Sequence, residues 1–421
     1  MTTVWYPCCA QILRTTQWSL TSPNSARSRC SLKPVWCLRF GTVPQAERLE
    51  AFQPTGDPYT DELLSLGVDA GLHRIGCADA SPLIEARNAI KRRIDGGLQD
   101  EMQFTFRNPK RSTTPNDALD GARSIIVAGL SYATPDVEPP FAVSGRVAKY
   151  SWVEYYEPLR RALTVVRDRL RSDGYRALVF ADDNSIVDRA VAHRAGIGWY
   201  GKNANILVPG AGSFFVLGSV VTTAELATSS IVEDGCGACR RCLDGCPTQA
   251  IIEPGVVDAR RCLAWLLQKP GVFDRRFRVA LGDRMYGCDD CQEVCPPTTR
   301  RQLRVTPPEG ARPWVDVEAL LEMTDEELLD SVDWWYVAQR NPDWVRRNAL
   351  IVLGNVGELG SPRVRDIVAT YLEHPDPMLR AHAVWAAARL GLHELIPMHD
   401  TAPLVIEELR DLPEVRTTRA N

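Results

Sequence analysis

The chain has 421 residues, of which 45% are hydrophobic and 24% charged, and its formal net charge is −4. This composition predicts a globular protein of two or three domains with a large buried core. It gives no overall signature of a nucleic-acid binder, although residues 258–312 hold eleven Lys and Arg against seven Asp and Glu. Apolar runs such as Phe214–Val221 are too short to span a bilayer, which excludes a membrane-spanning helix.

The first 46 residues differ from the rest of the chain. They contain no Asp or Glu, five Lys or Arg, and four cysteines, Cys8, Cys9, Cys30 and Cys37. A basic segment without acidic residues is typical of a transit-like extension. The absence of any helical or strand periodicity instead favours an unstructured extension at 1–56, or codons translated from upstream of the true start. We therefore leave these cysteines out of the motifs discussed below.

From Asp57 onward, mixed periodicity predicts an α+β fold. The apolar pattern predicts helices at 80–96, 158–170 and 186–195 and strands at 124–133, 176–181 and 213–223. The second helix has a proline in its first turn and Gly174 beyond its end, which is the usual asymmetry of helix termini.

Two acidic residues, Asp182 and Asp183, follow the predicted strand at 176–181. Ligands and catalytic groups collect at strand ends in α/β layers, because the scaffold fixes them and the adjoining loops shape a crevice. Alternation along an extended chain points the two carboxylates to opposite sides, so we expect one to face a pocket and the other to be a turn aspartate. The glycine-rich loop at 196–203 lacks the strand–turn–helix context of a dinucleotide site.

Eight of the thirteen cysteines lie between residues 236 and 296 with the spacing of bacterial ferredoxins. The first run, C-x2-C-x2-C-x3-C-P, begins at Cys236; the second run lacks its first ligand, which Cys262 can supply. The fourth cysteine of such a run ligates the other cluster. We therefore assign cluster one to Cys236, Cys239, Cys242 and Cys295 and cluster two to Cys246, Cys262, Cys288 and Cys291.

Zinc knuckles and disulfides are the alternatives for these cysteines. Paired C-x2-C sequences also suit tetrahedral zinc. Two C-P endings and a total of eight cysteines favour two cubane 4Fe-4S clusters instead. A disulfide framework is typical of small secreted domains, and the chain is long and shows no secretory signal. Iron–sulfur chemistry favours the reducing cytoplasm.

An internal repeat follows the connector at 300–313. Residues 345–357 and 379–391 align at an offset of 34 residues, each after a Pro-Asp turn, with alanines at Ala349 and Ala383. This pattern predicts helical hairpins of the HEAT kind, with a plain helical subdomain as the alternative. Two copies are too few for a free-standing solenoid, so we expect them to pack on the cluster region.

Taken together, these motifs resemble the epoxyqueuosine reductase family, cobalamin-dependent iron–sulfur enzymes of tRNA modification. The resemblance spans residues 57–395 and is carried by 181–182, 194–203, 212–218, 235–247, 257–262 and 286–296. It implies a cobalamin-binding α/β domain at 57–228, a ferredoxin-type double-cluster domain at 229–312 and a HEAT-like domain at 313–421.

The resemblance also implies an activity. Family members remove the epoxide oxygen of epoxyqueuosine in the anticodon loop of tRNA, with electrons passing through two 4Fe-4S clusters to cobalamin. Asp182 matches the family's proton-donating aspartate, as a departing alkoxide requires. The positions matching cobalamin-lining loops are Asp182, Arg146, Tyr150, Lys202, Asn203, Ile206 and Ser213. The protein is expected to act as a cytoplasmic monomer that takes electrons from an external donor.

Three departures from the family pattern concern the substrate. The chain has Glu154–Tyr156 where the family usually has Asp-Tyr-His, Ser185 in place of a proline, and Pro297 in place of a tryptophan. They leave open a related corrinoid reductase for a small molecule, while a non-catalytic two-cluster electron carrier is the third hypothesis. If tRNA is the substrate, the nearest candidates for phosphate contacts are Arg260, Arg261, Arg275, Arg276 and Arg278.

Overall fold

The computed structural model describes residues 50–302 and 305–417, which belong to one compact unit. The extension expected at 1–56 lies outside the described residues up to residue 49, and so do its four cysteines. Within the described part of the chain, no helix is both long and apolar enough to cross a membrane.

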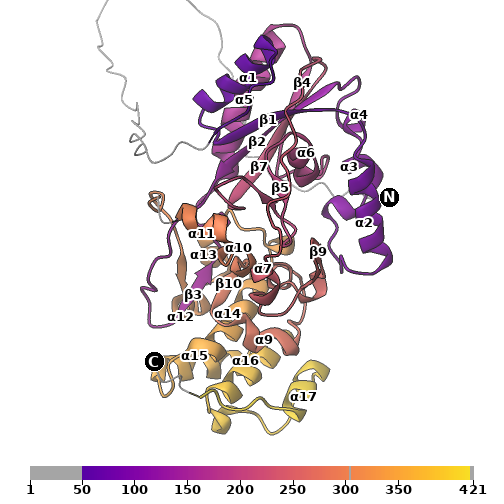
Figure 1. The fold of residues 1–421 in the computed structure, drawn as a ribbon. Helices are drawn as coiled ribbons and strands as arrows, with labels where there is room; N and C mark the ends of the chain where they lie inside the picture. Colours follow the sequence, from indigo (N-terminus) through magenta and orange to yellow (C-terminus); the bar gives the residue numbers. More distant parts are fainter. Residues whose placement is uncertain (1–49, 303–304, 418–421) are drawn as a thin grey trace, which may run out of the picture. The chain divides into compact units, whose positions relative to one another are not determined.

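A four-stranded antiparallel sheet organises the N-terminal part, in the order β1 (Arg74–Asp79), β2 (Ser124–Ser131), β7 (Phe215–Thr222), β4 (Ala177–Ala181). Helices α1 (Pro58–Asp69) and α5 (Tyr156–Ser172) cover one face, and α6 (Asp188–Arg194) packs on the other (Figure 1). Functional groups collect at strand ends chiefly in parallel sheets. The sheet here is antiparallel, yet Asp182 directly follows the end of β4.

Strand β2 is buried on both faces because its side chains alternate. Ile126 and Ala128 pack in the core beneath α1 and α5, whereas Ile125 and Val127 pack in the core beneath α6. A continuous apolar run is what a strand covered by helices on both sides requires.

A second sheet joins distant parts of the sequence. Strand β3 (Ser144–Val147) pairs in parallel with β10 (Arg284–Tyr286) and antiparallel with β11 (Trp314–Asp316). The central strand therefore comes from before both cysteine runs, whereas β10 immediately precedes the second run and β11 follows it. Strand β3 lies before the expected domain boundary at 228, but it pairs with strands that lie after it. The expected domain limits therefore remain a proposal.

Short elements surround the cysteines and link the larger ones. In the N-terminal part they are α2 (Ile84–Asp95), η1 (Phe104–Phe106), α3 (Pro109–Ser112), α4 (Pro115–Ala118), η2 (Lys149–Ser151), β5 (Trp199–Tyr200) and β6 (Ile206–Leu207). In the cysteine region they are α7 (Arg241–Asp244), β8 (Ile251–Glu253), β9 (Val256–Val257), η3 (Ala259–Arg261), α8 (Leu263–Leu266), α9 (Arg275–Leu281), α10 (Asp290–Glu293) and α11 (Pro296–Gln302).

The C-terminal part is helical. Its elements are α12 (Val317–Glu322), α13 (Asp325–Ser331), η4 (Ala338–Arg340), α14 (Asp343–Val356), α15 (Pro362–Leu372), α16 (Pro377–Arg389), η5 (His393–Leu395) and α17 (Pro403–Arg410). The two repeated segments lie on α14 and α16, which contact each other, and the aligned Ala349 and Ala383 are fully buried. Small side chains at these positions allow the helices to approach closely.

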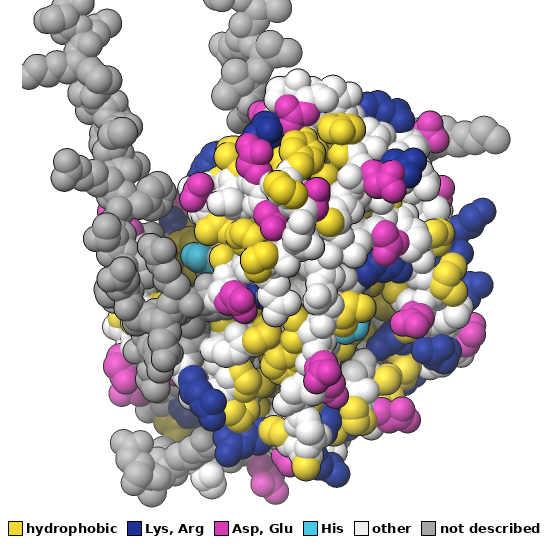
Figure 2. Space-filling model, turned by 45° about the horizontal axis from the view of Figure 1, so that its top comes forward, with side chains coloured by type: hydrophobic (Ala, Val, Ile, Leu, Met, Phe, Trp, Pro, Cys, Tyr) yellow, Lys and Arg dark blue, Asp and Glu magenta, His cyan; other side chains and the backbone are white. Residues whose placement is uncertain are grey.

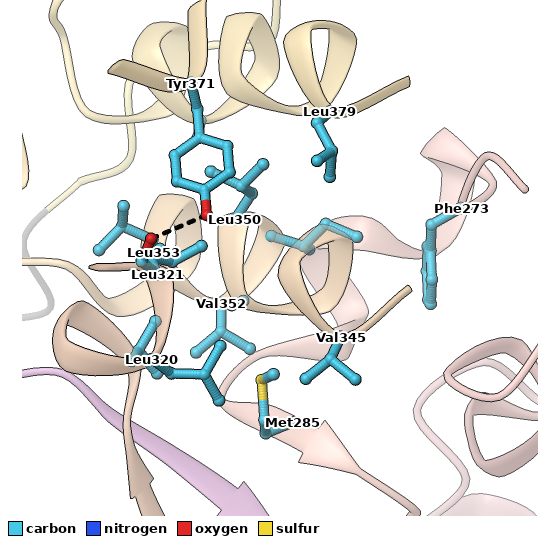
Figure 3. Close-up of a cluster of buried hydrophobic side chains, with 14 of the residues drawn as sticks. Phe273, Met285, Leu320, Leu321, Val345, Leu350, Val352, Leu353, Tyr371 and Leu379 are labelled. Carbon is cyan, nitrogen blue, oxygen red and sulfur yellow. Dashed lines mark hydrogen bonds between the residues drawn. The ribbon is translucent and has the colours of Figure 1, made fainter. Parts of the chain in front are cut away.

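The repeats pack on the cysteine region through a shared core. Figure 3 shows Met285 beside Val345 of α14, and Phe273 and Leu350 belong to the same buried cluster. The fully buried guanidinium of Arg347 donates to the carbonyl oxygens of Leu266, Leu267, Lys269 and Gly271 at 2.6–3.2 Å. These bonds satisfy the carbonyls that follow α8, while burial, followed by the charge of Arg278, lowers the pKa of Arg347 to about 9.

Candidate cofactor and substrate site

Eight cysteines of the described chain fall into two groups of free thiols, in addition to the buried Cys77. In the first group, burial raises the pKa of the Cys242 thiol, and the charges of Cys236 and Cys239 raise it further. Burial likewise raises the pKa of Cys295, again with Cys236 and Cys242 contributing. The structure therefore brings Cys295 of the second run beside the first run.

The second group forms around Cys291. Burial raises the pKa of this thiol well above its ordinary value, and the charges of Cys288, Cys262 and Cys246 raise it further. These are the two sets that the crossover spacing predicts, and Cys262 lies among the second. Thiols that hold their protons must release them when metal binds, so iron loading is coupled to proton release.

The surroundings of the sulfur atoms suit iron–sulfur clusters. The indole Nε1 of Trp199 donates to Sγ of Cys236 at 3.4 Å, and the backbone N–H of Ala250 donates to Sγ of Cys246 at 3.2 Å. Such donors tune the potential of a cluster. Among the described residues no three ligand side chains converge on a single metal ion, whereas a cubane needs one thiolate at each separate iron corner.

The loop after β4 presents Asp182 in an unusual backbone conformation. Its φ is +54°, in the left-handed region that non-glycine residues seldom adopt, and Arg160 anchors the strand end by donating to the carbonyl of Ala181 at 2.9 Å. Strand alternation therefore does not extend to Asp182. The carboxylate of Asp183 accepts the N–H of Ser185 at 2.6 Å, as expected of a turn aspartate.

The Asp182 side chain is exposed to solvent, and the starts of α5 and α6 lie close enough for Tyr156 and Asp188 to interact with its charge. Burial raises its pKa; the Arg160 guanidinium opposes this shift, and the charges of Asp183 and Glu154 add to it. The carboxyl thus keeps its proton to a higher pH than a free aspartate, as an acid catalyst requires.

Two further residues lie near Asp182: Tyr156, which the sequence offered only as a departure from the family pattern, and Asp188, which it did not identify. Burial, followed by the charge of Asp182, raises the pKa of Asp188 well above its ordinary value and also raises that of Tyr156. Asp188 begins α6 and Tyr156 begins α5, so both approach Asp182 from helix starts. The available signal was the position of each residue at the start of a predicted helix, close to the strand end.

Three of the expected cobalamin contacts bond to the cysteine region. The Nζ of Lys202 donates to the carbonyl oxygens of residues 237 and 239 at 2.6 and 2.9 Å. The amide of Asn203 donates to the carbonyl of residue 291 at 3.2 Å, and the hydroxyl of Ser213 donates to the side-chain oxygen of Gln292 at 3.0 Å. These residues line the seam between the first sheet and the cysteine loops.

The other expected contacts lie on the β3 side and in β6. Arg146 forms ion pairs with Asp283 and Glu293 at 3.1 and 3.7 Å. The hydroxyl of Tyr150 accepts a hydrogen bond from Gln268 at 3.2 Å, and Ile206 is buried beside the core under α6.

A cavity of about 340 Å³ opens next to the second thiol group. It is lined by residues that include Arg146, Lys149, Trp152 and Cys288, and it does not reach Asp182. This cavity is therefore separate from the exposed Asp182 carboxyl.

The expected phosphate-binding arginines are mostly engaged with carboxylates. Arg260, Arg275 and Arg276 are paired with Asp258, with Glu408 and Asp411, and with Asp274, respectively. Arg261 is partly exposed. The expectation was wrong for Arg278, whose side chain is 1% exposed and pairs with Glu408 at 3.0 Å, because α17 covers it.

The fold and site define an iron–sulfur protein with two cluster-type thiol groups, a group of carboxyls around the end of β4 and a tail of HEAT-like repeats. Models of three families match: 4Fe-4S double cluster binding domain at 235–298, HEAT repeats at 335–420, and Epoxyqueuosine reductase QueG at 113–183. The first match contains all eight cluster cysteines. It confirms the expected double 4Fe-4S domain, and the second confirms the repeats.

Curated relatives extend the match over most of the chain. The epoxyqueuosine reductase of Bacillus anthracis is 31% identical over 350 residues, covering 78% of this chain and 88% of the relative. That of Vibrio cholerae is 30% identical over 339 residues, covering 77% and 90%. The chain belongs to the epoxyqueuosine reductase family.

Solved structures of this family share the fold. An epoxyqueuosine reductase with a tRNA-Tyr epoxyqueuosine-modified stem loop superposes with a TM-score of 0.75 at 26% identity, covering 84% of this chain and 97% of that one. The Bacillus subtilis enzyme, with an aspartate catalytic loop swung out of its active site, gives a TM-score of 0.74 with the same coverage. These matches confirm the α+β fold class.

Proposed function

We propose that this chain reduces epoxyqueuosine to queuosine in the anticodon loop of tRNA. The observation that carries the proposal is Asp182, an exposed carboxyl with a raised pKa directly after a strand end, in a chain of this family with two cluster-type thiol groups. A relative of the same fold holds an epoxyqueuosine-modified tRNA stem loop. Loss of the epoxide oxygen as water consumes two electrons and two protons, so the site needs both an electron supply and an acid.

The residues present fit the implied cofactors. We assign one 4Fe-4S cluster to Cys236, Cys239, Cys242 and Cys295 and the other to Cys246, Cys262, Cys288 and Cys291. Cobalamin would be held along the seam by Lys202, Asn203, Ser213 and Ile206, with Arg146 and Tyr150 from the β3 side. When bound, these groups supply the low-potential electrons for the reduction, while the protein orients the substrate and limits water.

Asp182 delivers the proton to the departing epoxide oxygen. Its raised pKa keeps the acid form available, and the left-handed backbone turns the carboxyl off the line of β4. Tyr156 and Asp188 lie beside Asp182, and burial raises the pKa of both side chains.

We infer further that the protein works as a monomer in the cytoplasm and takes electrons from an external donor. The exposed Cys239 loop supports electron entry at cluster one, because that thiol group reaches the surface. We also propose domain limits for the three parts of the chain, at 57–228, 229–312 and 313–421. Strand β3 of the first part pairs with β10 of the second.

The decisive test is an anaerobic assay on purified, reconstituted protein with epoxyqueuosine-containing tRNA, a reductant, and cobalamin either present or omitted. Conversion to queuosine that requires cobalamin is the expected result. Protein that binds cobalamin and both clusters yet leaves the tRNA unchanged would overturn the proposal. Turnover of a small halogenated or epoxide substrate in its place would assign the chain to a small-molecule corrinoid reductase.

A further inference from the structure

Residues 84–112, here called the basic arm, comprise α2, η1 and α3 and carry an excess of positive charge. Their basic residues are Arg87, Lys91, Arg92, Arg93, Arg107, Lys110 and Arg111, against the acids Glu85, Asp95, Asp100 and Glu101. Two of these acids, Asp100 and Glu101, are engaged by Lys269 at 2.9 and 3.3 Å. The surface charge of the arm is therefore more positive than its composition suggests.

The positive side chains of the arm are available to a partner. Five of them, Lys91, Arg92, Arg107, Lys110 and Arg111, are exposed, and within residues 50–302 and 305–417 no ion pair engages them. This distinguishes the arm from the α9 region, where Arg275 and Arg276 are neutralised by carboxylates. Lys and Arg side chains gather along the right-hand edge of Figure 2, the side of α2 and α3 in Figure 1.

The arm is attached directly to the loop that carries the catalytic acid. The guanidinium of Arg111 donates to the hydroxyl of Ser185 at 3.4 Å, and the N–H of Val187 donates to the carbonyl of Ser112 at 3.0 Å. At its other end, Arg93 donates to the carbonyl of Gly255 in the β8–β9 turn at 2.8 Å. The arm thus spans one side of the region between the Asp182 loop and the cysteine region.

We propose that the basic arm binds the phosphate backbone of the anticodon stem loop and so orients the modified base toward Asp182. The inference rests on the proposed function. Unpaired Lys and Arg side chains supply the electrostatic attraction for phosphates. Phe104, 48% exposed on the same arm, offers a ring on which an unstacked loop base can stack.

RNA suits this surface better than an acidic electron-carrier protein does. A carrier must approach a cluster, and the exposed thiol is Cys239 in the first cysteine loop. The arm contacts the substrate acid's loop and the turn at Gly255, and it also bonds residues on either side of Cys262, through Leu98 with Ala259 and through Asp100 with Trp265. Its unpaired Arg111 lies on the side of the Asp182 loop, which favours the molecule that reaches Asp182 as the partner of the arm.

The test measures binding of a fluorescently labelled, unmodified anticodon stem loop to the full chain by anisotropy over a series of salt concentrations. The arm variants are K91A/R92A and R107A/K110A. The matched control is R123A/R176A, two exposed arginines at the opposite end of the sheet from Asp182. Each arm variant should bind several-fold more weakly, with the slope of log K against log salt reduced by about 1.5, and the control should match wild type.

Several outcomes would overturn the assignment of the arm. These are arm variants with wild-type affinity and slope, an equal loss in R123A/R176A, or normal RNA binding combined with slower reduction by an acidic carrier protein. The proposed reaction is tested separately. If wild type binds RNA through the arm but leaves the epoxide intact, the arm assignment stands and the reaction fails; if it converts the epoxide while arm variants bind normally, only the arm assignment fails.

Discussion

Replacing Asp182 with asparagine removes the acidic proton at the end of β4 while changing little else. The residue has φ +54°, and Asn is one of the few residues that visit this region without much strain. Alanine at the same position would add roughly 1–2 kcal/mol of backbone strain and confuse the result. D182N therefore tests the acid without displacing the loop.

The expected loss follows from the value of a positioned general acid. Such a group contributes about 10²–10⁴ in rate, or about 2.7–5.4 kcal/mol of transition-state stabilisation. We expect kcat for epoxyqueuosine-tRNA to fall by that factor, while KM for tRNA stays near wild type because phosphate contacts lie elsewhere. Wild-type kcat should decline as pH rises through the raised pKa of Asp182, and D182N should lack this decline.

The matched control is D183N, because the Oδ1 of Asn can still accept the N–H of Ser185. It should retain most of the wild-type rate. A D182N rate above about a tenth of wild type, or equal losses in both variants, would refute the assignment of the acid.

Stability gives a second measurement on the same variant. Burial disfavours the ionised form of Asp182 in the folded state, so its pKa lies above the unfolded value of 3.8. The folded protein then binds more protons, and stability falls as pH rises from about 4 through the folded pKa. D182N should melt at a higher temperature than wild type above this window, and the difference should vanish below it.

The remaining predictions concern the framework. C262A should lower the iron content from about eight to about four per chain, measured by iron analysis, because one cubane loses a ligand. R347A should destabilise by about 3–5 kcal/mol in denaturant titrations, since the carbonyls of Leu266, Lys269 and Gly271 lose their side-chain donor, while Asn348 still donates to the carbonyl of Leu267. A Cβ at Gly212 would lie 2.1 Å from Oγ1 of Thr298, whereas one at Gly210 would meet nothing within 4 Å. Both glycines have positive φ, so G212A should lose more thermal stability and more bound cobalamin than G210A, and equal effects would show that only strain matters.

Features encoded locally could be predicted from the sequence. Apolar periodicity placed β2, β4, β7 and α5 within a few residues of their observed limits, because burial on one or two faces leaves a direct trace in the pattern. The two sets of neighbouring thiols could also be predicted. In ferredoxin-type spacing the last cysteine of each run, here Cys246 and Cys295, joins the set formed by the other run. The assignment of clusters to those sets stays a prediction.

Features that depend on long-range packing could not be predicted. No local pattern shows that β3 pairs with β10 and β11, because these strands are separated by more than a hundred residues. The charge of Arg278 predicted a position on the surface. The residue is buried because Glu408, on a helix distant in the sequence, forms an ion pair with its guanidinium. In the sequence, Asp188 has the pattern of an ordinary acidic residue at a helix start. Its interaction with Asp182 depends on how α6 packs against the end of β4, which no local pattern indicates.

The seam between the first sheet and the cysteine loops explains how cofactor binding and electron transfer can be coupled in one chain. Lys202 and Asn203 come from the glycine-rich loop, yet their donors bond carbonyls of residues that belong to the two thiol groups. Ser213 reaches Gln292 between Cys291 and Cys295 in the same way. A cofactor resting on this loop would be held relative to both sets of cysteines through single side chains, and the proposed electron path would be short. The sequence differences at Tyr156 and Ser185 lie beside Asp182 and Asp183 instead, where they can alter the fit of the substrate without disturbing these bonds.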